Sequence, residues 1–201
     1  MTSQGVGSPK NGQPHKVGRL FVVSAPSGAG KSTLCLAVRR HMPCLAYSVS
    51  YTTRKPRPGE QEGREYHFVS QAVFEQGIAA GRWAEWAKVH GNYYGSSARW
   101  IGRALAKGRD ILMDIDVQGG RRIVKLFPHA VTIFIMAPAF KLLEQRLTSR
   151  ATDDPATIAL RLENARKELA QKDRYAHIVV NDDLKVATQT MIDLISHYRG
   201  T

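Results

Sequence analysis

The stretch LFVVSAPSGAGKST, residues 20–33, decides the fold of this 201-residue chain. Its first five residues form an apolar run that is typical of a buried strand, and a helical pattern begins at Lys31. Between them lies a glycine-rich turn whose backbone N–H groups can converge on phosphate oxygens at the positive end of the helix. Lys31 can reach the outer phosphates, and Ser32 supplies the hydroxyl that a nucleotide-bound Mg²⁺ requires. Ala25 replaces the first glycine of the common pattern GxxxxGK[ST], but the flanking strand and helix favour a phosphate-binding loop.

Apolar runs and helical patterns alternate along the rest of the chain. The continuous runs at 110–115 and 131–136 are typical of strands that are covered on both faces in a parallel sheet. Strands are expected over residues 20–24, 45–51, 65–69, 83–89, 110–115, 131–136 and 178–180, with a turn over 91–95. Helices are expected over residues 31–41, 70–80, 140–150 and 156–171, from Ser96 or Ser97 to Lys107, and at the C-terminus. This alternation predicts one α/β domain with a parallel central sheet flanked by helices.

Composition and charge narrow the class of partner. The chain has 29 Lys and Arg against 17 Asp and Glu, a formal net charge of +12 that favours acidic ligands. Because the basic residues are scattered and form no block, we expect small phosphorylated ligands and no nucleic acid. No apolar run approaches the ~20 residues that span a bilayer, so we expect a cytoplasmic protein without a membrane partner, and a homo-oligomer stays open. Residues 1–18 are expected to form a disordered tail, because they are rich in Gly, Ser and Pro and lack the apolar segment of a signal peptide.

An apolar run that ends in acidic residues lies at 111–116. In a nucleotide-binding sheet the carboxyl ends of the strands face the ligand, so Asp114 is a candidate for holding Mg²⁺ together with Ser32. A capping or salt-bridged aspartate is the alternative, and it would be preferred if the glycine-rich loop were absent.

Two polar clusters lie between the first helix and the middle of the chain. Residues 50–60 carry Arg54 and Arg57, which can both bind one phosphate, although an isolated cluster of this kind is more often a solvated basic loop. Residues 83–96 bring the Glu85 carboxylate together with phenols and hydroxyls, although aromatic core packing explains Trp83 equally well.

A third cluster consists of arginines around a polar loop. Arg146 and Arg150 share one helix face by their i,i+4 spacing, and Arg161 follows the loop at 151–155. Such a set can neutralise a phosphoryl group in transit, although a surface helix pair would carry arginines as well.

Five ordered blocks together resemble the guanylate kinases. They are SAPSGAGKS at 24–32, TTRKPRPGE at 52–60, GNYYG at 91–95, DID at 114–116 and VNDD at 180–183. The resemblance covers about residues 18–200 and implies transfer of the γ-phosphoryl group of ATP to GMP with Mg²⁺, giving ADP and GDP. It also implies a P-loop NTPase-type sheet with an α+β excursion for GMP and a helical lid. The implied division is a domain over 19–200 with its core at 19–49, 99–141 and 169–200, a GMP-binding subdomain at 50–98 and a lid at 142–168.

The resemblance also implies roles for single residues. The ATP side comprises Ser27, Gly28, Ala29, Gly30, Lys31, Ser32, Thr33 and Asn181. The residues implied to bind the GMP phosphate are Arg54, Arg57, Tyr66 and Tyr94, with Glu60 as a supporting acid. Those implied to bind the guanine are Ser50, Glu85, Ser96 and Asp116. The implied catalytic residues are Lys31, Arg54, Arg146, Arg150 and Arg161. The implied Mg²⁺ ligands are Ser32 and Asp114.

Base choice follows from hydrogen-bond chemistry. Guanine presents N1–H and an exocyclic amine as adjacent donors, and the Glu85 carboxylate can accept from both, whereas adenine would leave that carboxylate unpaired. Three alternatives stay open: a binding module of this family that has lost catalysis, a kinase for a phosphorylated sugar, and a nucleic-acid binder. Intact Lys31, Ser32 and Asp114 argue against the first, and intact Ser50, Glu85 and Tyr94 argue against the second.

Overall fold

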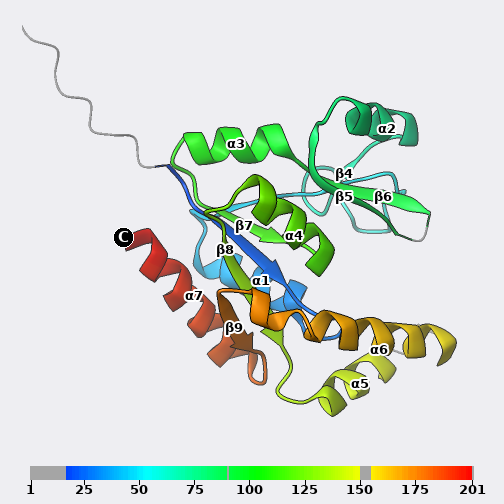
Figure 1. Ribbon diagram of the computed structural model, residues 1–201, viewed down its shortest axis with the longest axis vertical. Coiled ribbons are helices and arrows are strands. Elements are labelled where there is room, and N and C mark those ends of the chain that lie inside the picture. Colours follow the sequence, from blue (N-terminus) through cyan, green and yellow to red (C-terminus); the bar gives the residue numbers. More distant parts are fainter. Residues whose placement is uncertain (1–16, 90, 150–154, 201) are drawn as a thin grey trace, which may run out of the picture.

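A computed structural model describes residues 17–89, 91–149 and 155–200 of the chain (Figure 1). The predicted tail therefore falls outside the described residues except for residues 17 and 18, and so does Arg150 of the predicted lid. Within the described ranges, no helix is both long and apolar enough to cross a membrane.

Five of the described strands form a parallel central sheet in the order β2-β7-β1-β8-β9. They are β1 (Leu20–Ser24), β2 (Ala46–Tyr47), β7 (Ile111–Asp114), β8 (Val131–Met136) and β9 (His177–Val180). The predicted α/β class with a parallel sheet is thus confirmed. The alternating segment at 45–51 predicts one strand, and this is wrong, since only Ala46 and Tyr47 pair in this sheet.

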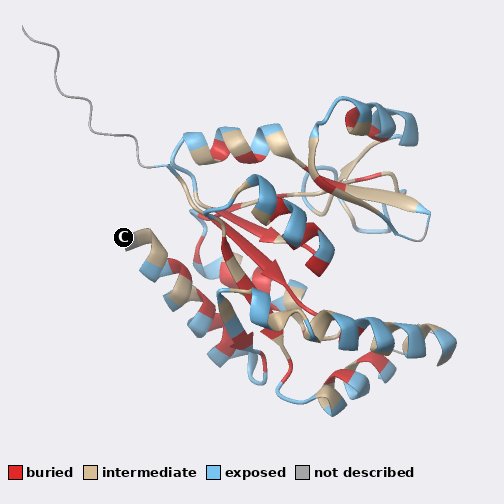
Figure 2. Ribbon diagram, in the orientation of Figure 1, coloured by how far each residue is buried: buried red, intermediate tan, exposed pale blue. Residues whose placement is uncertain are grey.

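Helices cover both faces of the central sheet. Because side chains alternate along each strand, successive residues pack against one helical layer or the other. Phe21 and Val23 pack with residues of α1 (Lys31–His41) and α7 (Leu184–Gly200). Leu20 and Val22 pack with residues of α3 (Ala98–Ala106) and α4 (Val117–Leu126) on the opposite face. Figure 2 shows the central strands as the most buried part of the molecule. Since each fully buried large apolar side chain stabilises by roughly 1.5–3 kcal/mol, this core holds the ends of the strands in fixed positions.

Four further described strands form a second sheet in the order β4-β3-β6-β5. They are β3 (Tyr51–Thr52), β4 (His67–Phe68), β5 (Trp83–Val89) and β6 (Asn92–Ser97), accompanied by α2 (Gln71–Ala79). The buried ring of Phe74 stacks on Trp83 at 4.4 Å and on Tyr93 at 5.2 Å, which attaches α2 to this sheet. The turn expected over 91–95 is wrong beyond Gly91, because residues 92–95 continue in β6 and pair with β5.

The remaining helices, α5 (Phe140–Thr148) and α6 (Pro155–Leu169), pack on each other through a small cluster around Leu143, Leu147 and Ala165. A short 3-10 helix, η1 (Lys172–Arg174), follows α6. Figure 1 shows the second sheet with α2 on one side of the carboxyl end of β1, and α5 with α6 on the other.

Candidate active site

The glycine-rich loop joins β1 to α1 as predicted. Gly28 and Gly30 have φ angles of 86° and 85°, values that glycine adopts without strain. α1 begins at Lys31 with the loop N–H groups at its amino end. The loop is fixed from outside by buried Asn181, whose Nδ2 donates to the Ala29 carbonyl oxygen at 2.8 Å. Asn181 follows β9, so the sheet itself positions the loop.

Lys31 forms an ion pair with Asp114 at the carboxyl end of β7. Burial lowers the pKa of the Lys31 ammonium, and the nearby Cys35, Asp116 and Glu168 act in the opposite direction. Ser32 is exposed in the first turn of α1. A hydroxyl and a carboxylate beside a phosphate loop suit Mg²⁺, because this ion takes one or two protein oxygens and fills its other positions with phosphate oxygens and water.

A cavity of about 780 Å³ extends from this loop to the second sheet. It is lined by Lys31, Ser32, Cys35, Leu36, Arg39, Tyr47, Ser50, Arg64, Glu65, Tyr66, Glu85, Ala87, Val89, Tyr94, Asp114, Ile115 and Asp116. Sequence reasoning missed Cys35, Arg39 and Tyr47. The spacing gave a signal for the first two, because Lys31, Cys35 and Arg39 are four residues apart and share one face of α1. The Arg39 guanidinium lies 3.9 Å from the centre of the Tyr47 ring.

Glu85 and Ser96 form a buried polar pair on adjacent strands. They are register partners in β5 and β6, and the Ser96 hydroxyl donates to Glu85 Oε1 at 2.7 Å. Burial raises the pKa of the Glu85 carboxyl, with Asp116 adding to the effect and the Ser96 hydrogen bond opposing it. Oε2 faces α4, where a Cβ on Gly119 would come within 3.0 Å of it. Asp116 also lines the cavity and caps α4 by accepting from the Gly119 N–H at 2.6 Å.

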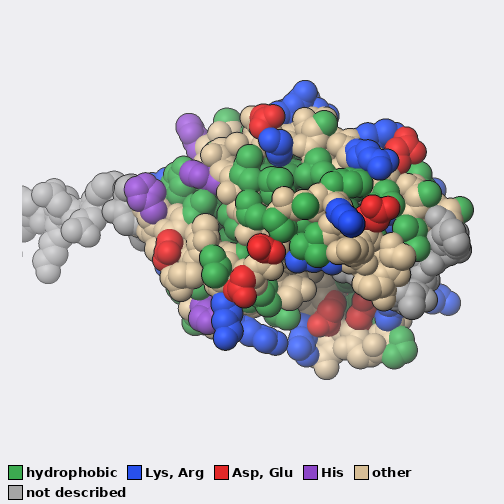
Figure 3. Space-filling model, turned by 90° about the horizontal axis from the view of Figure 1, so that it is seen from below, with side chains coloured by type: hydrophobic (Ala, Val, Ile, Leu, Met, Phe, Trp, Pro, Cys, Tyr) green, Lys and Arg blue, Asp and Glu red, His purple; other side chains and the backbone are tan. Residues whose placement is uncertain are grey.

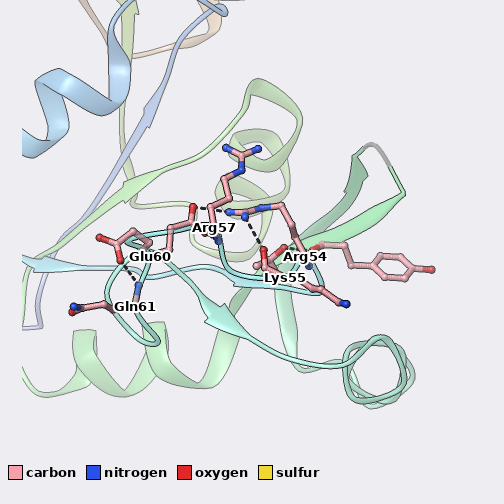
Figure 4. A network of polar contacts seen from close by, with 8 residues as sticks. Arg54, Lys55, Arg57, Glu60 and Gln61 are labelled. Carbon is pink, nitrogen blue, oxygen red and sulfur yellow. Dashed lines mark hydrogen bonds and ion pairs between the residues drawn. The ribbon is translucent and has the colours of Figure 1, made fainter. Parts of the chain in front are cut away.

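The predicted basic loop is ordered by Glu60 (Figure 4). The Glu60 carboxylate accepts from the Arg54 guanidinium and from the Arg57 backbone N–H, each at 2.8 Å. These two hydrogen bonds lower the pKa of the Glu60 carboxyl, the one from Arg54 more. Figure 4 shows the Arg57 guanidinium pointing away from Glu60. The Arg54 guanidinium lies 5.4 Å from the Tyr66 ring, whose edge contacts the Tyr94 ring at 5.8 Å between centres.

The structure places only some of the residues assigned to GMP in the cavity lining. The described lining includes Ser50, Tyr66, Glu85, Tyr94 and Asp116, while Arg54, Arg57, Glu60 and Ser96 lie outside it. Glu60 accepts a hydrogen bond from Arg54, and Ser96 donates one to Glu85.

The α5–α6 unit contacts both the glycine-rich loop and Asn181, the residue that fixes it. The Arg146 guanidinium donates to the Asn181 carbonyl oxygen, with both N···O distances at 3.3 Å. Glu168 near the end of α6 accepts from the Ser27 backbone N–H at 3.3 Å, and burial raises the pKa of its carboxyl. Arg161 is half-buried on α6. Sequence reasoning missed Glu168, although its position seven residues after Arg161 places both on one helix face.

A parallel sheet with a glycine-rich loop, an acidic strand end and a cavity that leads to a second sheet defines a protein with the P-loop NTPase fold. The sequence model of one family, described as guanylate kinase, matches residues 17–198, and the chain belongs to this family.

Relatives and solved structures agree with this assignment. The guanylate kinase of Dechloromonas aromatica is 48% identical over 170 residues, which are 85% of this chain and 84% of the relative. That of Vibrio vulnificus is 48% identical over 172 residues, 85% of this chain and 83% of the relative. The crystal structure of guanylate kinase from Anaplasma phagocytophilum superposes with a TM-score of 0.74 at 30% identity and covers 91% of this chain and 87% of that one. A shikimate kinase from Bacteroides thetaiotaomicron, with a TM-score of 0.50 at 12% identity over 89% of this chain and 98% of that one, shares the fold alone.

Proposed function

We propose that this chain transfers the γ-phosphoryl group of ATP to GMP and releases ADP and GDP. The observation that carries the proposal is the cavity of about 780 Å³ that has Lys31 at the phosphate loop and the buried carboxylate of Glu85 among its lining residues. A triphosphate at the loop and a purine monophosphate in the cavity would bring the two reacting groups together. The site assignments rest on family membership and on these contacts.

The donor side consists of the loop and the groups that fix it. The backbone of residues 27–33 would enclose the ATP phosphates, and Lys31 would exchange its contact with Asp114 for a phosphate oxygen. Asn181 acts indirectly, by holding the Ala29 carbonyl. Glu168 occupies the Ser27 N–H in this conformation, so a phosphate that takes this N–H must displace it.

The acceptor side selects guanine through Glu85. Ser96 takes one lone pair of Glu85 Oε1 and leaves Oε2 and the second lone pair of Oε1 for the two adjacent donors of guanine. An adenine in the same place would present an acceptor to a buried carboxylate, and mismatches of this kind discriminate by about 10⁴-fold or more. Ser50 and Asp116 complete the guanine side.

The GMP phosphate would bind to Arg54, Arg57, Tyr66 and Tyr94. Glu60 contributes by positioning, because it holds the Arg54 guanidinium and the Arg57 backbone in one loop. The Tyr66 hydroxyl stays protonated over the working pH range, since burial raises the pKa of its phenol, and it can therefore donate to a phosphate.

Phosphoryl transfer needs alignment and charge compensation. One oxygen of the GMP phosphate forms a bond to the γ-phosphorus, the bond from that phosphorus to the β–γ bridging oxygen breaks, and ADP leaves with the electron pair. Lys31, Arg54, Arg146, Arg150 and Arg161 are the cations that we assign to the transferring group. Arg150 lies outside the described residues.

Ser32 and Asp114 are the residues that would hold Mg²⁺, and their oxygen donors fit this ion. When bound, the ion would neutralise charge on the β- and γ-phosphate oxygens. The chain's own part is to present the two oxygens beside the loop.

We further propose that residues 50–98 and 142–168 close over the substrates as two units, which would exclude water that otherwise accepts the phosphoryl group. A cytoplasmic location and small-molecule partners complete the proposal. The scattered basic side chains support small-molecule partners, because on the face drawn in Figure 3 Lys and Arg lie in separate groups among hydrophobic and other side chains.

An acceptor panel tests the proposal. ADP formation from ATP is measured with GMP, dGMP, AMP and ribose 5-phosphate as acceptors. We expect turnover with GMP and dGMP and a large preference for either over AMP. Absence of ADP formation with every acceptor would favour a binding module, and preference for ribose 5-phosphate would favour a sugar-phosphate kinase.

A further inference from the structure

A second cavity, of about 450 Å³, lies beside α4 at a place that the proposed reaction does not use. It is lined by Val117, Gly120, Arg121, Val124, Lys125, Thr132, Gln171, Arg174 and Tyr175. These residues come from α4, from β8 and from the segment around η1. The volume lies within the range of small-molecule sites, about 300–1,000 Å³.

The lining carries an uncompensated positive charge. Arg121, Lys125 and Arg174 supply three cations, and none of the nine described lining residues is acidic. The Arg121 guanidinium donates to Gln171 Oε1 at 2.8 Å, a neutral partner that orients it across a separation of 50 residues without cancelling its charge. The ion pairs found between described residues include none of these three cations. Three cations in the lining of one cavity favour an anion that offers several acceptors, such as a phosphate.

The floor of the cavity is apolar or aromatic. Val117 is buried, Val124 is half-buried, and Tyr175 packs its ring against Phe134 at 5.1 Å with its hydroxyl fully buried. An inorganic anion would leave this surface exposed, whereas an apolar group attached to the phosphate would cover it.

We propose that this cavity binds a small phosphorylated molecule that carries an apolar ring or chain next to its phosphate. Arg121 from α4 and Arg174 from η1 bind the phosphate, and the valines contact the apolar part. The site is separate from the proposed ATP and GMP positions, since the described linings of the two cavities share no residue.

The position of this site gives its occupant a physical route to the active site. The N-cap residue of α4 is Asp116, which lines the first cavity. η1 follows α6, whose Glu168 contacts the phosphate loop. A ligand between α4 and η1 therefore contacts two segments that each end at the active site.

The test is a titration of the isotope-labelled full chain, followed by the amide signals in two-dimensional NMR spectra. The probes are phenyl phosphate, inorganic phosphate and a short RNA duplex. We expect saturable shifts of the amides of 117–125 and 171–175, with phenyl phosphate binding more tightly than inorganic phosphate. Any binding at the catalytic loop is read separately, from the amides of 27–33.

The decisive variant is Arg121→Gln with Arg174→Gln, since both side chains are exposed and their replacement leaves the core intact. We expect phenyl phosphate to bind at least about tenfold more weakly at 117–125, because two charge-assisted contacts are lost, with the response of 27–33 unchanged. The matched control is Arg99→Gln with Arg103→Gln, which removes the same charge from the exposed surface of α3 and should leave both responses as they are.

Three outcomes would overturn the proposal. They are shifts confined to 27–33, equal affinity of the Arg121/Arg174 variant and the parent, and tighter binding of a short RNA duplex than of phenyl phosphate at the same amides. The last outcome would assign the surface to nucleic acid.

Discussion

Replacing Glu85 by Gln separates base recognition from folding. The amide keeps an oxygen for the Ser96 hydroxyl, so the buried pair of β5 and β6 can persist. The second oxygen becomes an NH₂ group, which meets the donors of guanine with a donor. The substitution therefore changes the chemistry of one atom position and leaves the shape of the site.

The expected loss can be worked from the contacts. One hydrogen bond from guanine to Oε2 is lost, at about 1.5 kcal/mol as the lower value for charged acceptors, and the guanine donor left facing the NH₂ group costs about 1.5 kcal/mol more, which amounts to about 3 kcal/mol. This corresponds to a loss of about two orders of magnitude in kcat/KM for GMP. The kcat/KM for AMP should not decrease, because the new amide N–H can donate to adenine N1. The preference for GMP over AMP should therefore narrow by about the same factor.

The stability of the fold, unlike the activity with GMP, should not decrease in this variant. Because burial raises the pKa of Glu85 above its unfolded value, its ionisation costs stability as the pH rises from the unfolded pKa through the folded one. The neutral Gln removes this cost, so the variant should be at least as stable as the parent near neutral pH. A coupled assay with GMP and with AMP measures the first effect, and urea unfolding measures the second. An unchanged preference in a stably folded variant would refute the assignment of Glu85.

Three further predictions concern the same two regions. The KM for GMP should rise as the pH falls through the raised pKa of Glu85, because a protonated carboxyl offers one acceptor fewer. The Glu85→Gln variant should lack this rise, and identical pH profiles of parent and variant would contradict the prediction. Gly119→Ala places a Cβ 3.0 Å from Glu85 Oε2 and should raise the KM for GMP by about tenfold with the KM for ATP unchanged, whereas an equal change in both constants would indicate a general distortion. Gly30→Ala meets a positive φ and places a Cβ 2.4 Å from Asn181 Nδ2, so it should destabilise by about 1–3 kcal/mol in urea unfolding and raise the KM for ATP; wild-type values of both would show that the loop is not fixed as described.

The sequence predicted the elements that local chemistry specifies. The strand at 20–24 and the helix at 31–41 agree residue by residue with β1 and α1, because an apolar run, a glycine-rich turn and a helix pattern follow one another directly. Ser70, the first residue of the helix expected over 70–80, is the N-cap of α2 and accepts from the Val73 N–H, as serine commonly does at this position.

The errors have a tertiary origin. The alternating pattern at 45–51 predicts one strand, because such a pattern does not say which sheet a strand joins. The chain instead passes from the central sheet to the second sheet within this segment. Gly95 was read as a turn residue, but it is buried in β6, where a Cβ would come within 2.9 Å of the Phe74 ring. The glycine is needed for space and not for a turn.

The candidate site was predictable where a motif was available and was missed where only packing makes the contact. Lys31, Asp114, Glu85 and Tyr94 were all assigned from motifs, and the structure brings them to one cavity. Glu168 had no motif, since its contact with the Ser27 N–H depends on how α6 lies against the loop.

The most direct measurement is a crystal structure of the chain with a compound that joins adenosine and guanosine through their phosphates. We expect the guanine N1–H and amine within hydrogen-bond distance of Glu85, and the phosphate chain extending from Arg54 and Tyr94 to the backbone of 27–33. A guanine bound elsewhere, with Glu85 still paired only to Ser96, would contradict the proposed role of Glu85 in binding guanine.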